Sequence, residues 1–179
     1  SDTEVRELAA RLRKERIPTD VIWLDIDFQD RNRPFTTNPK TFPDLPKLAR
    51  DLKTDGFGLV AITDLHIAHA PSQGYAPFDS GAAGNHFLRT AKGRTYVAPV
   101  WPGDSVFPDF TRAASRDWWG ELYKDFASAG IAGFWNDMNE PAIFETPSKT
   151  MPLDNVHRIE GDGFATREAT HAEVHNVYG

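Results

Sequence analysis

Short apolar segments alternate with helical patterns along the chain, and this alternation constrains the fold more than any other feature. The segments are Val21–Ile26, Leu59–Thr63, Tyr96–Trp101 and Ile131–Trp135, and three of them contain or lead into acids, namely Asp25 with Asp27, Asp64 and Asp137. Continuous apolar runs of this kind are typical of strands buried on both faces, and helices between them indicate βαβ units. The sequence therefore predicts an α/β fold built on a parallel sheet.

Apolar residues recur at helical spacing between these runs. The predicted helices are Ser1–Arg16, Leu45–Lys53, Ser115–Ala129 and Thr166–Val177. Ser1 and Glu4 fit a capping box at the start of the first helix. Gly56 and Gly130 are expected to end the second and third helices. The stretch Pro71–Gly93 predicts an excursion at about 71–94, and Glu145–Gly163 predicts a loop.

The acids at the strand ends favour a barrel over a doubly wound sheet. No predicted strand is followed by a GxGxxG phosphate-binding turn. Polar groups at several strand C-termini are what a (β/α)₈ TIM barrel uses to build its site, and such a barrel takes about 250 residues. Since this chain has 179 residues, we expect it to form about half of a barrel. The open sheet edges would then need a partner segment.

Composition removes several classes of function. The chain has no cysteine, which excludes a disulfide framework, cysteine-ligated zinc, iron–sulfur clusters and thiol catalysis. Its net charge of −6, without a basic stripe, does not favour nucleic acid as a partner. No apolar run approaches the roughly 18 to 20 residues that span a bilayer. The charged start SDTEVREL does not resemble an intact signal peptide, which leaves the compartment open.

The densest polar constellation is GFWNDMNEP, residues Gly133–Pro141. Small and apolar residues lead into Asp137, and Asn139 and Glu140 follow directly. A charged cluster after a buried strand costs desolvation energy, so it usually has a partner or a function. Two interpretations stay open from the local pattern: Asp137 or Asn139 caps a following helix, or the cluster carries chemistry.

Three acids fall within the segment DIDFQD, residues Asp25–Asp30. Alternation along a strand would place Asp25 and Asp27 on one face. An EF-hand calcium loop needs a glycine and a later glutamate that this segment lacks. Hydrogen bonding to a polyol, or ion pairing with Arg31 and Arg33, is therefore favoured over metal binding.

Histidines offer two further sets of polar groups. TDLHIAH places Asp64 near His66 and His69, a conceivable set of metal ligands. HAEVH places His171 and His175 on one helical face, but alanine stands where the HExxH metalloprotease motif has its glutamate. Capping or packing is the favoured interpretation of these histidines.

Aromatic residues are abundant, with 5 Trp, 12 Phe and 4 Tyr. Large flat side chains fill cores, and they also form platforms for sugar rings and other planar ligands. Trp118 and Trp119 lie at adjacent positions of a predicted helix, so we expect at least one of them in the core.

Several motifs in a fixed order resemble glycoside hydrolase family 31, whose best-known members are α-glucosidases. The motifs are WLDIDFQD, ITDLHI, VWPG with FPDFT, WW, GFWNDMNEP and HNVYG. The similarity covers essentially the whole chain, and WNDMNEP is highly specific. The resemblance implies a (β/α)₈ TIM barrel and retaining hydrolysis of terminal α-glucosidic bonds.

The resemblance also implies roles for individual residues. Asp137 matches the catalytic nucleophile, which forms a covalent glycosyl-enzyme, and Glu140 matches a glutamate that contributes to the active site. The residues that match the sugar pocket are Asp25, Ile62, Asp64, Trp101, Trp135 and Met138. The resemblance implies no metal and no cofactor. The implied partners are a small carbohydrate substrate and the remainder of the same catalytic domain.

The chain departs from the family pattern in two respects. Leu65 stands where the family usually has proline, which leaves Asp64 in place. In relatives the general acid/base aspartate and a substrate-binding arginine follow the HNVYG segment, and the first barrel strand precedes the segment that matches Ser1. The resemblance therefore implies that residues 1–179 form a partial catalytic domain without the first strand, the C-terminal strands and the general acid/base.

Other functions stay open on the sequence. An α-xylosidase, α-galactosidase or α-transglycosylase of the same family differs in contacts to the sugar's C6 position, which the sequence does not identify. A metal-dependent hydrolase would use Asp64, His66 and His69 with Asp25. A non-catalytic sugar-binding module is a third alternative. The oligomeric state stays open as well.

Overall fold

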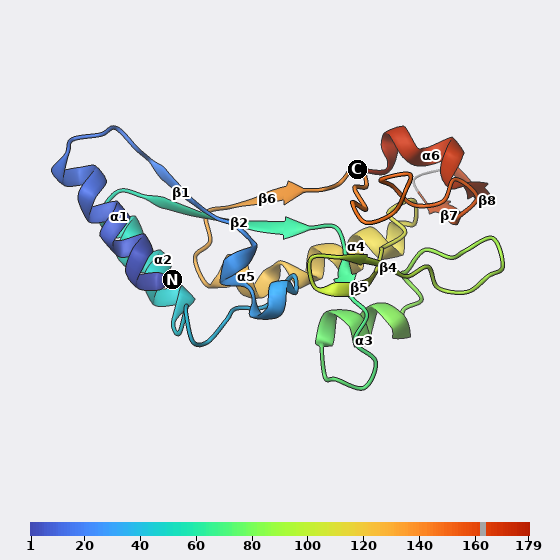
Figure 1. The fold of residues 1–179 in the computed structure, drawn as a ribbon, viewed down its shortest axis with the longest axis horizontal. Coiled ribbons are helices and arrows are strands. Elements are labelled where there is room, and N and C mark those ends of the chain that lie inside the picture. Colours follow the sequence, from blue (N-terminus) through green and yellow to red (C-terminus); the bar gives the residue numbers. More distant parts are fainter. Residues whose placement is uncertain (162–163) are drawn as a thin grey trace. The chain divides into compact units, whose positions relative to one another are not determined.

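The computed structural model describes residues 1–161 and 164–179 (Figure 1). These residues form two compact units. The first unit consists of Ser1–Thr63 and Tyr123–Asn136, and the second unit consists of Asp64–Leu122 and Asp137–Gly179. The assignment of residues 1–179 to a single partial catalytic domain with an excursion stays a prediction.

A parallel sheet is built mainly from residues of the first unit. Its strands are β1 (Val21–Leu24), β2 (Gly58–Asp64) and β6 (Gly133–Asp137), in the order β1-β2-β6. Val21 lies opposite Gly58 in a parallel register. The backbone N–H of Ala132 donates to the carbonyl of Leu59 at 2.8 Å, and the arrows of β2 and β6 point the same way in Figure 1. The predicted parallel sheet is confirmed.

Helices precede β1 and β2 as the sequence predicts. The helical elements of the first unit are α1 (Asp2–Lys14), the 3-10 turns η1 (Ile26–Phe28) and η2 (Asp30–Asn32), α2 (Leu45–Thr54) and α5 (Lys124–Ser128). Ser1 and Glu4 form the predicted capping box of α1. Asp44 caps α2 by accepting from the N–H of Lys47 at 2.8 Å. Gly56 follows α2 with φ at 81°, a conformation that favours glycine and ends the helix.

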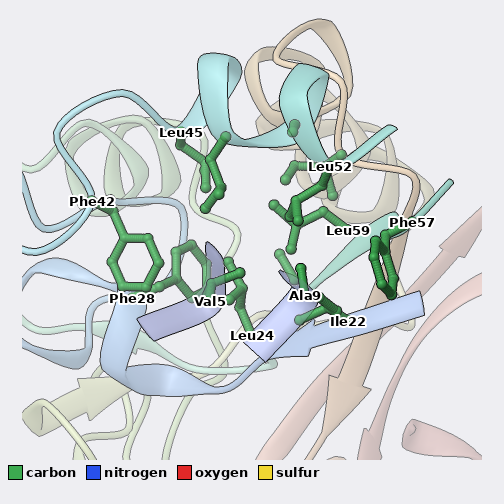
Figure 2. Packing of buried hydrophobic residues seen from close by; sticks show 14 of the residues in the cluster. Val5, Ala9, Ile22, Leu24, Phe28, Phe42, Leu45, Leu52, Phe57 and Leu59 are labelled. Carbon is green, nitrogen blue, oxygen red and sulfur yellow. The ribbon is translucent and has the colours of Figure 1, made fainter. Parts of the chain in front are cut away.

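Apolar side chains of α1, α2 and the sheet form the core of the first unit (Figure 2). The core includes Val5 and Ala9 of α1, Leu45, Leu48, Ala49 and Leu52 of α2, Ile22 and Leu24 of β1, and Leu59 and Ala61 of β2. Along β1, Ile22 and Leu24 are buried, whereas Val21 and Trp23 are exposed. Burial of one large apolar side chain stabilises the folded state by about 1.5–3 kcal/mol. The many buried side chains shared by α1, α2 and the strands therefore hold the two helices against the sheet.

The first strand is shorter than the predicted Val21–Ile26. It ends at Leu24, and η1 follows directly. The Oδ1 atom of Asp25 accepts from the first backbone N–H of η1 at 2.7 Å, which caps the turn. The expectation that Asp25 and Asp27 share one strand face is therefore wrong, because the chain has already left the strand.

An antiparallel sheet lies in the second unit. Its strands are β3 (Ile67–Ala68), β5 (Gly103–Val106) and β4 (Ala98–Val100), in the order β3-β5-β4. Ala98 lies opposite Ser105, because the chain turns back directly after β4. The prediction that Tyr96–Trp101 adds a strand to the parallel sheet is wrong. A short apolar run looks the same in either kind of sheet, and only its neighbours decide between them.

The stretch Pro71–Gly93 contains a helix, α3 (Ala76–Ala83). The rings of Phe78 and Phe87 stack with centroids 5.9 Å apart. A Cβ atom built on Gly81 would lie 2.3 Å from the ring of Phe87, so glycine permits this close packing. Aromatic packing therefore accompanies a helix in a segment that the sequence marks mainly by its turn-forming residues.

The predicted helix Ser115–Ala129 is interrupted. It consists of α4 (Ala113–Leu122) and α5, with Tyr123 between them. The ring of Tyr123 contacts Phe134 at 4.6 Å between centroids, and its hydroxyl donates to Asn136 Oδ1 at 2.9 Å. These tertiary contacts place Tyr123 in the first unit, whereas α4 belongs to the second.

A β-hairpin and a short helix end the described chain. They are β7 (Val156–Gly161), β8 (Phe164–Thr170) and α6 (His171–Tyr178). Val156 lies opposite Thr170 in an antiparallel register. The predictions of a loop over Glu145–Gly163 and a helix over Thr166–Val177 are therefore wrong in part. Polar side chains occupy much of the hairpin, so no apolar run marks it, and residues 162 and 163 of the predicted loop lie outside the described residues.

Within residues 1–161 and 164–179, no helix is both long enough and apolar enough to cross a bilayer. The sequence shows no long apolar run either.

Candidate active site

Asp137 is the last residue of β6, and its side chain is half-buried. The next residue, Met138, is half-buried and has a φ of 59°, a left-handed conformation that costs a non-glycine residue about 1–3 kcal/mol. The carbonyl of Met138 accepts from the N–H of Ala142 at 2.9 Å, which closes a turn carrying Asn139 and the exposed Glu140. Residues 138–155 are all described and contain no helix, so the capping interpretation of Asp137 and Asn139 is wrong.

Asp64 ends β2 and is 1 % exposed. His66 follows it and is 3 % exposed, with its Nδ1 atom 4.0 Å from Asp64 Oδ2. Burial lowers the pKa of His66 to about 3, because the apolar surroundings disfavour the charged imidazolium. His66 is therefore a neutral imidazole beside the carboxylate at neutral pH.

The geometry does not support the metal set Asp64, His66 and His69. The ring of His69 packs edge-on against Phe78, with centroids 5.2 Å apart. In the described part of the chain, no group of three or more histidine, aspartate or glutamate residues is arranged to hold a metal ion. These residues are thus close together in the sequence, but their side chains do not form a set of metal ligands.

Three candidate residues lie in the first unit. Asp25 is exposed directly after β1, and its carboxylate caps η1. Ile62 is 3 % exposed, and its carbonyl accepts from Gln29 Nε2 at 3.4 Å. Trp135 is half-buried and meets Trp23 edge to face, with ring centroids 6.0 Å apart. Two indole rings thus lie together on this unit, one of them on the exposed side of β1.

Trp101 lies in the second unit, in the turn between β4 and β5. It is 43 % exposed, and its ring contacts Phe144 with centroids 4.6 Å apart. An indole held by packing yet open to solvent suits contact with the C–H face of a sugar.

In the described residues, β1, β2 and β6 each have a carboxylate at or directly after their carboxyl end. Asp25 follows β1, Asp64 ends β2 and Asp137 ends β6. This is the edge on which a TIM barrel builds its site. By unit, Asp25, Ile62 and Trp135 belong to the first, and Asp64, Trp101, Asp137, Met138 and Glu140 belong to the second.

Ion pairing in DIDFQD involves its last acid. Asp30 pairs with Arg33 and, at 3.4 Å, with Arg31. Burial alone would raise the pKa of Asp30, but the hydrogen bonds and charges of the two arginines outweigh it and lower the pKa. The expected arginine pairing is thus seen for Asp30, and Asp25 instead bonds the backbone of η1.

A chain of histidines in the second unit was not predicted. His157 Nδ1 lies 3.3 Å from Asp109 Oδ1, His157 Nε2 lies 2.8 Å from His171 Nδ1, and His171 Nε2 lies 3.0 Å from His175 Nδ1. Burial, together with its two histidine neighbours, lowers the pKa of His171 to about 4. The packing interpretation of His171 and His175 is confirmed. The spacing HAEVH indicates the contact between His171 and His175. The contacts with His157 and Asp109 could not be read from the sequence, because these residues lie far from His171 along the chain.

Trp118 and Trp119 are both half-buried and belong to neither hydrophobic core cluster, so the expectation that at least one of them lies in the core is wrong. Trp118 stacks on His86 with ring centroids 4.8 Å apart, and Trp119 meets Phe110 edge to face at 5.3 Å. The two rings therefore pack against different aromatic partners.

Comparison with known proteins identifies the family to which the chain is similar. The model of the glycosyl hydrolases family 31 TIM-barrel domain matches residues 1–179. Alpha-glucosidase 2 of Bacillus thermoamyloliquefaciens is 41% identical over 179 residues, which are 100% of this chain and 22% of that protein. Lysosomal alpha-glucosidase of Mus musculus is 33% identical over 193 residues, covering 98% of this chain and 20% of that protein.

Solved structures agree with the family model. A crystal structure of the glucosidase II alpha subunit bound to DNJ is 34% identical and superposes with a TM-score of 0.88, covering 100% of this chain and 18% of that one. A family 31 alpha-glucosidase from Bacteroides thetaiotaomicron is 44% identical with a TM-score of 0.73, covering 83% of this chain and 25% of that one. The chain spans about a fifth of the length of the relatives it matches. The chain therefore belongs to glycosyl hydrolase family 31 and lies within the TIM-barrel domain of that family.

Proposed function

We propose that these residues supply part of the active site of a retaining α-glucosidase, with Asp137 as the nucleophile. The observation that carries the proposal is the position of Asp137, at the carboxyl end of a parallel strand in a family 31 barrel. Relatives that are 41% and 33% identical are named alpha-glucosidases. The proposal concerns the full-length protein in which these residues work.

In the first step, a carboxylate oxygen of Asp137 forms a bond to the anomeric carbon of the sugar. The bond from that carbon to the leaving oxygen breaks, and the oxygen takes a proton from a second carboxylic acid about 5 to 5.5 Å away. In the second step, water loses a proton to that group and displaces Asp137, which restores the original anomeric configuration. The remainder of the catalytic domain would supply the second acid.

The other candidate residues would bind the sugar. Asp25 and Asp64 would accept hydrogen bonds from its hydroxyls, and Trp101 and Trp135 would cover its C–H faces. The apolar side chains of Ile62 and Met138 would shape the pocket, and Glu140 would contribute from the turn after Asp137. Several carboxylates repel an anionic ligand, so the proposed substrate is a neutral carbohydrate.

Removal of the Asp137 carboxylate tests the proposal. In the full-length protein, Asp137→Gly should lower turnover of 4-nitrophenyl α-glucoside by at least about 10⁴-fold. Added azide should then enter the vacated space and bond to the anomeric carbon as nitrophenolate leaves. The product should be a glucosyl azide of inverted configuration, which NMR identifies.

The matched control is Asp154→Gly, because Asp154 is an exposed carboxylate in a turn of the same unit. It should keep wild-type turnover. Near-wild-type turnover by Asp137→Gly would refute the nucleophile assignment. A folded Asp137→Gly protein that forms no glucosyl azide would refute it as well.

The sugar preference has its own test. The wild-type protein should hydrolyse 4-nitrophenyl α-glucoside with a higher kcat/KM than the α-xyloside or the α-galactoside. Preference for the xyloside would show a pocket closed around the C6 position, and preference for the galactoside would show a changed contact at C4. Either result would replace the glucosidase proposal with another activity of the family.

A further inference from the structure

Gly179, directly after the described residues of α6, packs on the turn that carries the proposed nucleophile. A Cβ atom built on Gly179 would lie 2.0 Å from the carbonyl oxygen of Asn139 and 3.0 Å from its carbonyl carbon. The side-chain amide of Asn139 donates to the carbonyl of Gly179 at 3.4 Å. Real Cβ atoms do not approach backbone this closely, so only glycine permits this contact. Asn139 stands between Asp137 and Glu140 in the chain.

Tyr178, the residue before Gly179, anchors this part of α6. It is 5 % exposed, and its hydroxyl donates to the carbonyl of Pro108 at 2.5 Å. Burial raises the pKa of Tyr178 well above its ordinary value, so the hydroxyl stays protonated and remains a donor. The residue next to Gly179 is thus tied to the segment that follows β5.

The histidine chain anchors the start of α6. Asp109, His157 and His171 are each 0 % exposed. Burial would raise the pKa of Asp109, but hydrogen bonds from His157, Thr111 and the N–H of Arg158 outweigh it, so the carboxylate stays ionised and only accepts. His157 links this carboxylate to His171, with its Nε2 atom 2.8 Å from His171 Nδ1. His171 Nε2 in turn lies 3.0 Å from His175 Nδ1.

A helix held by contacts at both His171 and Tyr178 can hold a strained turn. The turn contains Met138 at a φ of 59°, and such residues persist where the surrounding structure over-determines them. Gly179 is the point at which α6 meets this turn. Asp137, Asn139, Tyr178 and Gly179 all belong to the second unit, so the contact lies within one compact body.

We infer that Gly179 is a positioning residue, through which α6 holds the turn of Asp137 to Glu140 in the conformation that aims the nucleophile. The inference rests on the proposed function of Asp137. Gly179 itself does not contact the substrate in this inference. A shift of the turn would move the Asp137 carboxylate away from the anomeric carbon, and a displacement of about 1 Å can cost on the order of 100-fold in rate.

The test is a double-mutant cycle in the full-length protein. Gly179→Ala should lower kcat for 4-nitrophenyl α-glucoside by about 10- to 100-fold, with KM changed less than about 3-fold. In the Asp137→Gly background, Gly179→Ala should leave the rate of azide-dependent turnover unchanged, because the group it positions is already gone. The matched control is Gly120→Ala in α4, where a Cβ atom meets nothing within 4 Å, and it should keep wild-type kcat.

Two results would overturn the inference while leaving Asp137 as the nucleophile. One is wild-type kcat in Gly179→Ala. The other is an equal loss of rate in both backgrounds, which would mean that Gly179 acts on the fold in general. Failure of azide to rescue Asp137→Gly would instead contradict the proposed function itself.

A second variant covers the case in which Gly179→Ala does not fold. Tyr178→Phe keeps the ring and removes only the hydroxyl that donates to Pro108. It should lower kcat several-fold in the wild-type background and leave azide-dependent turnover of Asp137→Gly unchanged. Wild-type kcat in Tyr178→Phe, or an equal loss in both backgrounds, would overturn the inference.

Discussion

At the scale of single residues, His66 departs far from its behaviour in water. It is 3 % exposed, and its Nε2 atom has no hydrogen-bond partner within the described residues. Protonating it in the folded state would bury a charge, which is why its pKa falls to about 3. In the unfolded chain the imidazole regains its ordinary pKa near 6.5 and takes up a proton more readily.

This difference predicts a loss of stability in acid. Below about pH 6.5 the unfolded state binds the proton of His66 and the folded state does not, so the free energy of unfolding falls with pH until about pH 3. The slope from one such group is about 1.4 kcal/mol per pH unit. His171, with its pKa lowered to about 4, adds a second contribution between about pH 6.5 and pH 4. Urea denaturation at a series of pH values measures the slope.

The substitution His66→Gln isolates the first contribution. Glutamine does not titrate, so the slope between pH 6 and pH 4 should fall by up to about 1.4 kcal/mol per pH unit and keep the parts that come from His171 and from His86, whose pKa burial also lowers. An unchanged slope in this variant would show that the folded state protonates His66 as easily as the unfolded state does.

At the scale of elements, α2 illustrates how one helix holds the sheet. Leu48 is 0 % exposed within the core of the first unit. Leu48→Ala should lower the free energy of unfolding by about 2–5 kcal/mol, because it leaves a cavity between α2 and the strands. Chemical denaturation measures the loss.

A matched substitution on the same helix is Arg50→Ala, since Arg50 is exposed. Its effect should stay within about 0.5 kcal/mol. A similar loss from both substitutions would mean that helix formation, and not burial against the sheet, limits stability.

At the scale of the whole molecule, the parallel sheet is a section of a barrel. In the described residues β2 pairs on both sides, whereas β1 and β6 each pair with β2 on one side. A closed (β/α)₈ barrel pairs every strand on both sides, so the remaining strands of the domain should cover these two edges.

Hydrogen exchange tests this arrangement. In a polypeptide of residues 1–179 alone, amides of β1 and β6 should exchange at least about 10-fold faster than those of β2, because an edge strand opens more readily. In the full-length protein the three strands should be protected alike. Equal protection in both proteins would mean that no further strand pairs with β1 or β6.

Local patterns in the sequence account for much of the first unit. The capping box of Ser1 and Glu4 formed, α2 begins at Leu45, and Asp64 and Asp137 each end a strand. These features depend on residues close in the chain, such as a cap with its helix or an apolar run with the acid after it. Because their physical cause is local, the periodicity of apolar residues and the capping rules predict them.

The second unit depended on distant partners. The run at Ala98–Val100 pairs with β5 in an antiparallel sheet, and the hairpin of β7 and β8 has no apolar run to mark it. Distant partners matter in the first unit too, where the ring and hydroxyl of Tyr123 contact Phe134 and Asn136. Local sequence patterns fit these contacts and their alternatives equally well, so they do not predict which one forms.

The sequence by itself determined the family motifs, the parallel strands with their terminal carboxylates, and the expectation that Asp137 is the nucleophile. Only the tertiary structure decided that His66 is a buried neutral imidazole, that Asp109 orders a chain of histidines, and that Gly179 abuts Asn139. The reason is that burial, hydrogen-bond direction and steric exclusion depend on distances between atoms. Residues far apart in the chain acquire such distances only when the elements pack.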